Sequence, residues 1–124
     1  MATYTGGCHC GELKYKAVIN AEQIIICHCL DCQKLSTSAF RTVARSAPNS
    51  LTFIKGQPKE YTKTAESGNK RAQGFCQHCG SHIYAVSVGE GDKIYSIRVG
   101  SSDQRDALIP TSQIWTQSAQ KWLS

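Results

Sequence analysis

The chain has 124 residues, 40% of them hydrophobic and 19% charged, with a formal net charge of +5 at pH 7. This length and composition predict a single globular domain over residues 1–124 and exclude a disordered or fibrous chain. No apolar run is long enough to cross a membrane, and residues 1–7 lack the charged start and apolar run of a signal peptide, so we expect a cytoplasmic protein without a membrane partner.

Short strands separated by turns are predicted along most of the chain. Residues 12–18 alternate, with Leu13, Tyr15 and Ala17 on one face, as in a half-buried strand. Residues 31–36 predict a short helical turn. Further strands are predicted at residues 24–26, 39–45, 51–55, 59–64, 82–88, 94–99 and 112–116, and residues 71–75 lead into the last cysteine pair. No segment has a long helical apolar period, so the fold class is mainly β.

Seven cysteines are the unusual feature of the composition. An odd number cannot be fully paired within one chain, and cytoplasmic thiols stay reduced. Clustered thiols in a reducing compartment indicate metal binding. The three clusters are Cys8 and Cys10; Cys27, Cys29 and Cys32; and Cys76 and Cys79.

The last cluster has the spacing of a zinc knuckle. Cys76 and Cys79 are three residues apart and are followed by Gly80, which accepts the backbone conformation of a tight turn. Cys8 and Cys10 would project to the same face of an extended chain, so both thiols could reach one ion. Each of these pairs therefore supplies half of a tetrahedral site.

Counting ligands suggests how the clusters combine. A closed structural zinc takes four ligands, and two whole clusters make four only when Cys8 and Cys10 join Cys76 and Cys79. We call these four residues the four-cysteine group. The three-cysteine group, Cys27, Cys29 and Cys32, then has three ligands and an open position, as in catalytic zinc sites. A shared multinuclear thiolate cluster and an iron–sulfur centre remain alternatives at this point.

An open zinc site with three thiolates has characteristic chemistry. Its net charge of −1 makes the zinc a poor Lewis acid for generating hydroxide, but a good centre for holding a substrate thiol as thiolate. Nearby cations would have to offset this charge, and Lys34, Arg41 and Arg45 follow the three-cysteine group in sequence. The site therefore favours sulfur chemistry over hydrolysis.

The histidines are not expected to be metal ligands. His9 and His28 lie between cysteines and would point away from the metal in an extended chain, and His78 lies inside the knuckle. His82 begins a predicted strand as a core residue or a neighbour of the metal site. With all seven cysteines assigned to metal, no thiol remains for a Cys–His nucleophile pair.

The cysteine motifs resemble those of the glutathione-dependent formaldehyde-activating enzyme family, which includes centromere protein V. The resemblance covers about residues 4–122. It rests on Gly7-Cys8-His9-Cys10-Gly11, on residues 27–34 (Cys-His-Cys-Leu-Asp-Cys-Gln-Lys), on Phe75-Cys76-Gln77-His78-Cys79-Gly80, and on the ending Pro110-Thr111-Ser112-Gln113-Ile114-Trp115 with Ser118-Ala119 and Trp122.

The resemblance implies a β-tent fold with two Zn²⁺ ions per chain. One would be structural, on Cys8, Cys10, Cys76 and Cys79, and the other catalytic, with an open position, on Cys27, Cys29 and Cys32. The implied activity is that of S-(hydroxymethyl)glutathione synthase, the addition of glutathione to formaldehyde, which is a carbon–sulfur lyase reaction in reverse. Glutathione, a small anionic thiol, fits the mild basic bias.

Two other functions compete with this interpretation. A zinc-ribbon-like binding module would use both metals structurally, but the basic residues form no stripe interleaved with aromatics, so we do not expect a nucleic-acid partner. A redox or metal-handling protein would use the open thiolates directly. The sequence has no pattern that indicates a number of subunits.

Overall fold

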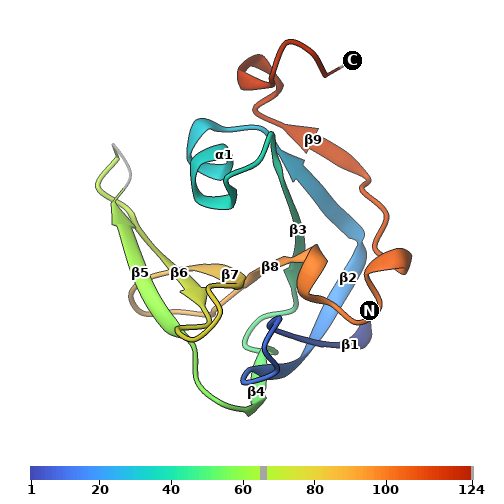
Figure 1. Ribbon diagram of the computed structural model, residues 1–124, viewed down its shortest axis with the longest axis vertical. Helices are drawn as coiled ribbons and strands as arrows, with labels where there is room; N and C mark the ends of the chain where they lie inside the picture. Colours follow the sequence, from blue (N-terminus) through green and yellow to red (C-terminus); the bar gives the residue numbers. More distant parts are fainter. Residues whose placement is uncertain (65–66, 124) are drawn as a thin grey trace.

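A computed structural model describes residues 1–64 and 67–123 of the protein (Figure 1). Strands dominate it, as the sequence predicts. The elements are β1 (Ala2–Gly7), β2 (Lys14–Cys27), α1 (Leu30–Ser36), β3 (Arg41–Ser46), β4 (Thr52–Lys55), β5 (Lys59–Thr64), β6 (Lys70–Phe75), β7 (His82–Ser87), β8 (Ser96–Arg98) and β9 (Ser112–Ile114), with short 3-10 turns at Val99–Ser101, Arg105–Ala107 and Thr116–Ser118. None of the described helices is long and apolar enough to span a membrane.

Within the described residues, nine strands form one sheet in the order β1-β2-β3-β8-β7-β6-β5, and β4 and β9 also pair with β2. All the strand pairs are antiparallel except β2 with β9. In Figure 1, β5, β6 and β7 form one flank of the molecule, β1, β2 and β9 form the other, and α1 lies above and between them. The mainly β class is therefore confirmed.

Strand β2 connects the two ends of the molecule. Its first half pairs with β1 and β4, and its second half pairs with β3 and β9. The register with β3 shifts between Ile19 and Ile24, where the long strand changes its neighbours. The predicted strands at residues 12–18 and 24–26 are thus parts of one strand, which ends at Cys27.

Alternate residues along β2, and Leu13 just before it, form part of the hydrophobic core. Leu13, Tyr15 and Ala17 are all buried, which confirms the face predicted for them. Ile83 on β7 and Ile97 on β8 are fully buried in the same cluster. These strands therefore form a packed core from which the cysteine loops project.

A Gly74→Ala substitution on β6 should destabilise this core. A Cβ at Gly74 would lie 2.2 Å from ring atoms of Tyr84, its partner across β6 and β7, so the buried ring would have to move. Overpacking of this kind costs about 1–3 kcal/mol of unfolding free energy, which urea denaturation would measure. Gly100→Ala is the control, because a Cβ there meets nothing within 4 Å. Equal stability of the two variants would contradict the prediction.

Candidate metal centres

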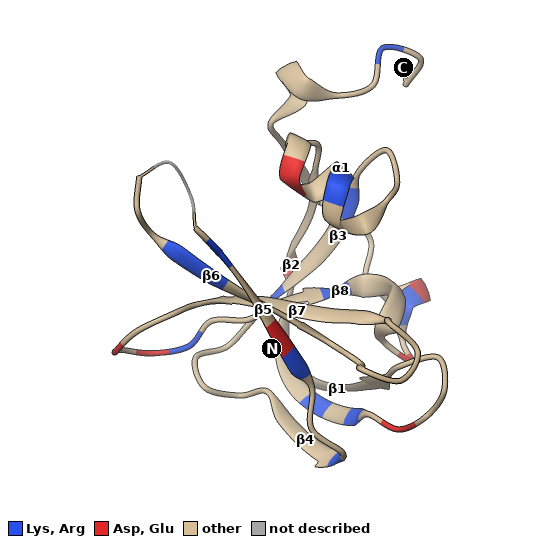
Figure 2. Ribbon diagram, turned by 60° about the vertical axis from the view of Figure 1, so that its left-hand side comes forward, with Lys and Arg blue, Asp and Glu red and all other residues tan. Residues whose placement is uncertain are grey.

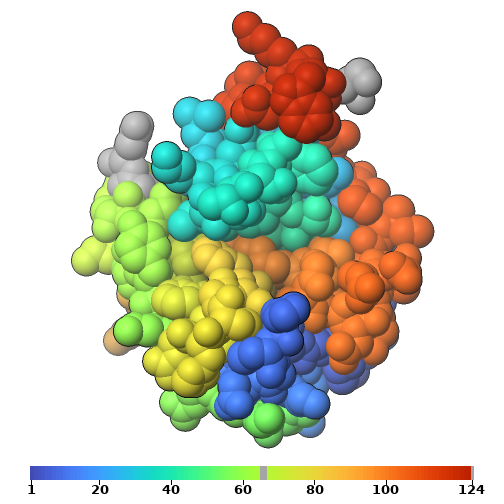
Figure 3. All heavy atoms as spheres, viewed as in Figure 1, coloured from blue at the N-terminus to red at the C-terminus, as the bar shows by residue number. Residues whose placement is uncertain are grey.

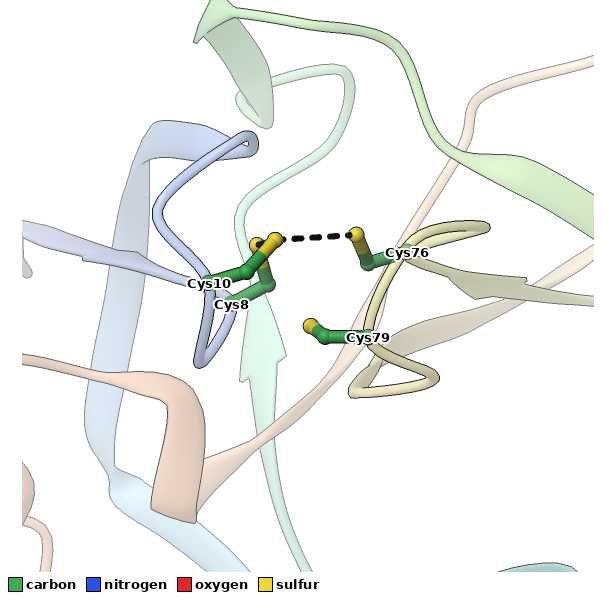
Figure 4. A group of neighbouring side chains, drawn as sticks. All are labelled: Cys8, Cys10, Cys76 and Cys79. Carbon is green, nitrogen blue, oxygen red and sulfur yellow. Dashed lines mark hydrogen bonds between the residues drawn. The ribbon is translucent and has the colours of Figure 1, made fainter.

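The four-cysteine group forms where two loops far apart in sequence meet. One loop follows β1 and holds Cys8 and Cys10, and the other joins β6 to β7 and holds Cys76 and Cys79. Figure 4 shows their side chains pointing toward one another, and all four sulfurs lie within 4.8 Å of each other. The Sγ atom of Cys10 lies 3.6 Å from Sγ of Cys8 and 3.7 Å from Sγ of Cys76.

These sulfur distances fit a metal site. A tetrahedral ion with zinc–sulfur bonds near 2.3 Å separates its sulfurs by about 3.8 Å, whereas a disulfide brings them to about 2 Å. All seven cysteines are free thiols. The four-cysteine group could therefore hold one tetrahedral metal ion, and its donor set is consistent with zinc.

Two similar turns shape the four-cysteine group. The N–H of Gly11 donates to the carbonyl of Cys8, and the N–H of Gly80 donates to the carbonyl of Cys76. Both glycines have positive φ, +83° and +80°, a conformation that other residues rarely adopt. Cys8 and Cys10 thus share a face through a turn, and not through the extended chain expected from the sequence.

Hydrogen bonds to sulfur stabilise thiolates in this group. The N–H of Leu13 donates to Sγ of Cys8 at 3.2 Å, and the N–H of His78 donates to Sγ of Cys76 at 3.4 Å. The Ser81 side chain and backbone donate to Cys79 and lower the pKa of its thiol to about 5. Because a metal takes the thiolate form, these donors support metal binding.

Ser81 links the two loops, and a Ser81→Ala substitution should weaken metal binding. Its hydroxyl lies 3.3 Å from Sγ of Cys79 and accepts from the N–H of His9 at 3.1 Å. Loss of such an outer partner lowers metal affinity by about 10- to 100-fold. Competition with a colorimetric chelator would measure this change, with the exposed Ser87→Ala as control. Unchanged affinity in Ser81→Ala would contradict the role assigned to the hydroxyl.

The three-cysteine group lies at the junction of β2 and α1. Cys27 ends β2, Cys32 lies in α1, and Cys29 is the N-cap of α1, where its Sγ accepts from the N–H of Cys32 at 3.2 Å. Their sulfurs lie within 4.8 Å of one another and form a group separate from the first. A single cluster shared by all seven cysteines is therefore wrong, whereas the division into four and three is confirmed.

Several contacts fix the chain around the three-cysteine group. Strand β9 runs parallel to the end of β2, and the N–H of His28 donates to the carbonyl of Ile114. The Gln33 side chain on α1 donates to the carbonyls of His28 and Ser118 at 2.8 and 2.9 Å. The C-terminal segment thus holds this loop in place, although it lies more than 80 residues away in sequence.

The pKa values of Cys27 and Cys32 shift in opposite directions. A hydrogen bond from Cys32 lowers the pKa of Cys27, and the same contact, together with burial, raises the pKa of Cys32. The positive charge of Arg41 lowers the pKa of Cys32 in turn. A metal ion that binds thiolates displaces the protons that thiols share, so this group also fits a metal ion.

None of the four histidines joins either group in the described part of the chain. His28 is buried, with Nε2 2.7 Å from Oε1 of Gln113 and its ring packed against Phe40. His82 lines a cavity between α1 and the knuckle loop, and burial followed by the charge of Arg98 lowers its pKa.

A cavity of about 340 Å³ opens beside the three-cysteine group. Arg41 and Arg45, predicted as neighbouring cations, both line it. Lys34, the third candidate, lines a different surface depression. Lys63, Arg71, Gln73 and Arg98 also line this cavity and were missed by the sequence interpretation, because β5, β6 and β8 bring them there and no local motif marks them.

The fold and the sequence are similar to those of known proteins. A crystal structure of a Rhodobacter sphaeroides protein superposes with a TM-score of 0.66 at 18% identity, over 88% of this chain and 98% of that one, which shows a shared fold. No curated protein matches the sequence. The family model described as glutathione-dependent formaldehyde-activating enzyme matches residues 3–118. With both cysteine groups assembled and almost the whole sequence matched, the chain belongs to the glutathione-dependent formaldehyde-activating enzyme family.

Proposed function

We propose that the protein is a zinc-dependent enzyme that accelerates the addition of glutathione to formaldehyde, forming S-hydroxymethylglutathione, and so acts as a carbon–sulfur lyase in the reverse direction. The observation that carries this proposal is the convergence of Cys27, Cys29 and Cys32 at the wall of a 340 Å³ cavity, in a member of this family. Three thiols, and not four, leave room for a ligand.

The two cysteine groups have different roles in this proposal. Cys8, Cys10, Cys76 and Cys79 would hold a structural Zn²⁺, and Cys27, Cys29 and Cys32 would hold the catalytic one. Zinc bound to three thiolates supplies a centre that favours the deprotonated form of a substrate thiol.

The chain's own residues orient and stabilise the reactants. The thiol of glutathione gives its proton to solvent, and its sulfur forms a bond to the carbonyl carbon of formaldehyde as the π bond of the carbonyl group breaks. The carbonyl oxygen becomes negative until it takes a proton from solvent. Guanidinium groups of the cavity are the available donors to this oxygen. Leu35, Val43 and Trp115 form apolar parts of the wall, which lower the local dielectric and strengthen these contacts.

The test is the exchange rate between formaldehyde, glutathione and their adduct, measured by exchange NMR. Zinc-loaded protein should accelerate exchange well above the uncatalysed rate, and protein treated with a chelator should not. No acceleration by fully loaded protein would contradict the proposed reaction and favour the alternative of a binding module with structural metals.

The free thiols also bear on the cellular compartment in which the protein would act. Because all seven cysteines are free thiols, a reducing compartment such as the cytoplasm suits both metal groups. We also propose that residues 1–124 act as one domain, since the sheet connects both cysteine groups and the family match spans residues 3–118.

A further inference from the structure

The cavity beside the three-cysteine group has an excess of positive charge. Arg41, Arg45, Arg71 and Arg98 all line it. Its acidic lining residue, Asp31, forms an ion pair with Lys63 at 2.6 Å. Among the described residues, no carboxylate forms an ion pair with any of the four arginines. Figure 2 shows the basic residues on β6 and β8 in the region below α1.

Two of these arginines, Arg41 and Arg98, contact a buried glutamine side chain. Gln73 is 2% exposed, and its Oε1 accepts from Nη2 of Arg98 at 3.0 Å and lies 3.5 Å from Nη1 of Arg41. Arg98 is 7% exposed and also donates to the carbonyl of Ser96. The Nε atoms of Arg41 and Arg98 are buried without a hydrogen-bond partner. Two cations therefore share one neutral oxygen, which is costly without an anion.

The arginines also affect one another. Burial, and then the charge of Arg41, lowers the pKa of Arg98 to about 9. Burial, and then the charges of Arg45 and Arg41, lowers the pKa of Arg71. The thiolates of Cys27 and Cys32 oppose this repulsion. With a divalent ion bound, however, three thiolates leave only one negative charge for several cations.

The arginine pair also borders a second space. Leu35, Arg41 and Arg98 line both the 340 Å³ cavity and a cavity of about 520 Å³ between α1 and the knuckle loop, where Gly80 and His82 lie. Figure 3 shows these segments meeting on one face of the molecule, α1 in teal above the knuckle region in yellow. Arg41 and Arg98 therefore lie at the boundary between the two cavities, close to the three-cysteine group.

We propose that Arg41 and Arg98, positioned by Gln73, form a subsite for an oxyanion, a carboxylate or a phosphate, carried by the ligand whose thiol reaches the three-cysteine group. Guanidinium groups match both anions in shape and charge. The identity of the ligand as a thiol rests on the proposed function. The oxyanion subsite itself rests on the uncompensated buried charge.

The test compares two thiols that differ in the anion. Isothermal titration of zinc-loaded protein with mercaptopropionate and with mercaptopropanol, without formaldehyde, should show about tenfold or tighter binding of the carboxylate, since a hydrogen bond to a charged group has this effect. Arg41→Gln and Arg98→Met should bring the two affinities together. Arg45→Gln, an exposed arginine of the same cavity, is the control and should largely retain the preference.

Acetate and inorganic phosphate distinguish the two oxyanions. Whichever competes better against mercaptopropionate identifies the group carried by the ligand, and either result supports the subsite. Three results would overturn it: equal affinity for the two thiols, competition by neither anion, or an unchanged preference in both Arg41→Gln and Arg98→Met. Because formaldehyde is absent, these results are independent of whether the protein accelerates the glutathione reaction.

Discussion

A Cys76→Ser variant is expected to lose one metal ion per chain and its cooperative unfolding. Cys76 is 1% exposed, and its sulfur lies 3.7 Å from that of Cys10. The substitution would open the metal cross-link that we propose between the loop after β1 and the loop before β7. Structural zinc contributes about 10–16 kcal/mol in small zinc domains, which is as large as the whole stability of a typical domain, about 5–15 kcal/mol.

Metal analysis and thermal unfolding followed by circular dichroism would measure both effects. Wild-type protein stripped of metal by a strong chelator should behave like Cys76→Ser, because both lack the cross-link. If Cys76 were simply a buried apolar residue, the substitution would cost about 1–3 kcal/mol and leave metal content unchanged. A cooperative variant with a full complement of metal would therefore contradict the assignment of this group.

Local patterns in the sequence predicted most strands and the α1 turn. Alternation at Leu13, Tyr15 and Ala17 gave the buried face of β2, because side chains of a strand alternate between faces. Strand β1 was missed, since Ala2–Gly7 carries no clear apolar alternation and is defined by its pairing with β2. The parallel pairing of β9 with β2 was also out of reach, because it joins segments more than 80 residues apart.

The metal groups were predictable for a different reason. The distance between cysteines in sequence restricts which thiols can reach one ion, and counting ligands to four then leaves one division of the clusters. The charged cavity offered no such rule. Arg71 and Arg98 come from different strands, and Gln73 acquires its role only when β6 lies beside them. Contacts set by strand order cannot be read from local spacing.

A Cys29→Ser variant is expected to lose all acceleration of the glutathione–formaldehyde exchange while keeping the fold. Serine is a good N-cap residue, so its hydroxyl can accept the bond from the N–H of Cys32 that Cys29 accepts now, and α1 should remain. It cannot replace the thiolate as a metal ligand. Metal content should fall from two ions to one, with a melting temperature within about 5 °C of wild type.

Lys34→Ala is the matched control, because Lys34 lies on the same short helix but outside the three-cysteine cavity. This variant should retain both metal ions and the acceleration measured by exchange NMR. Acceleration that survives in Cys29→Ser would show that the three-cysteine group is not the reaction site. Loss of cooperative unfolding in Cys29→Ser would instead show that the fold depends on this group as it does on the four-cysteine group.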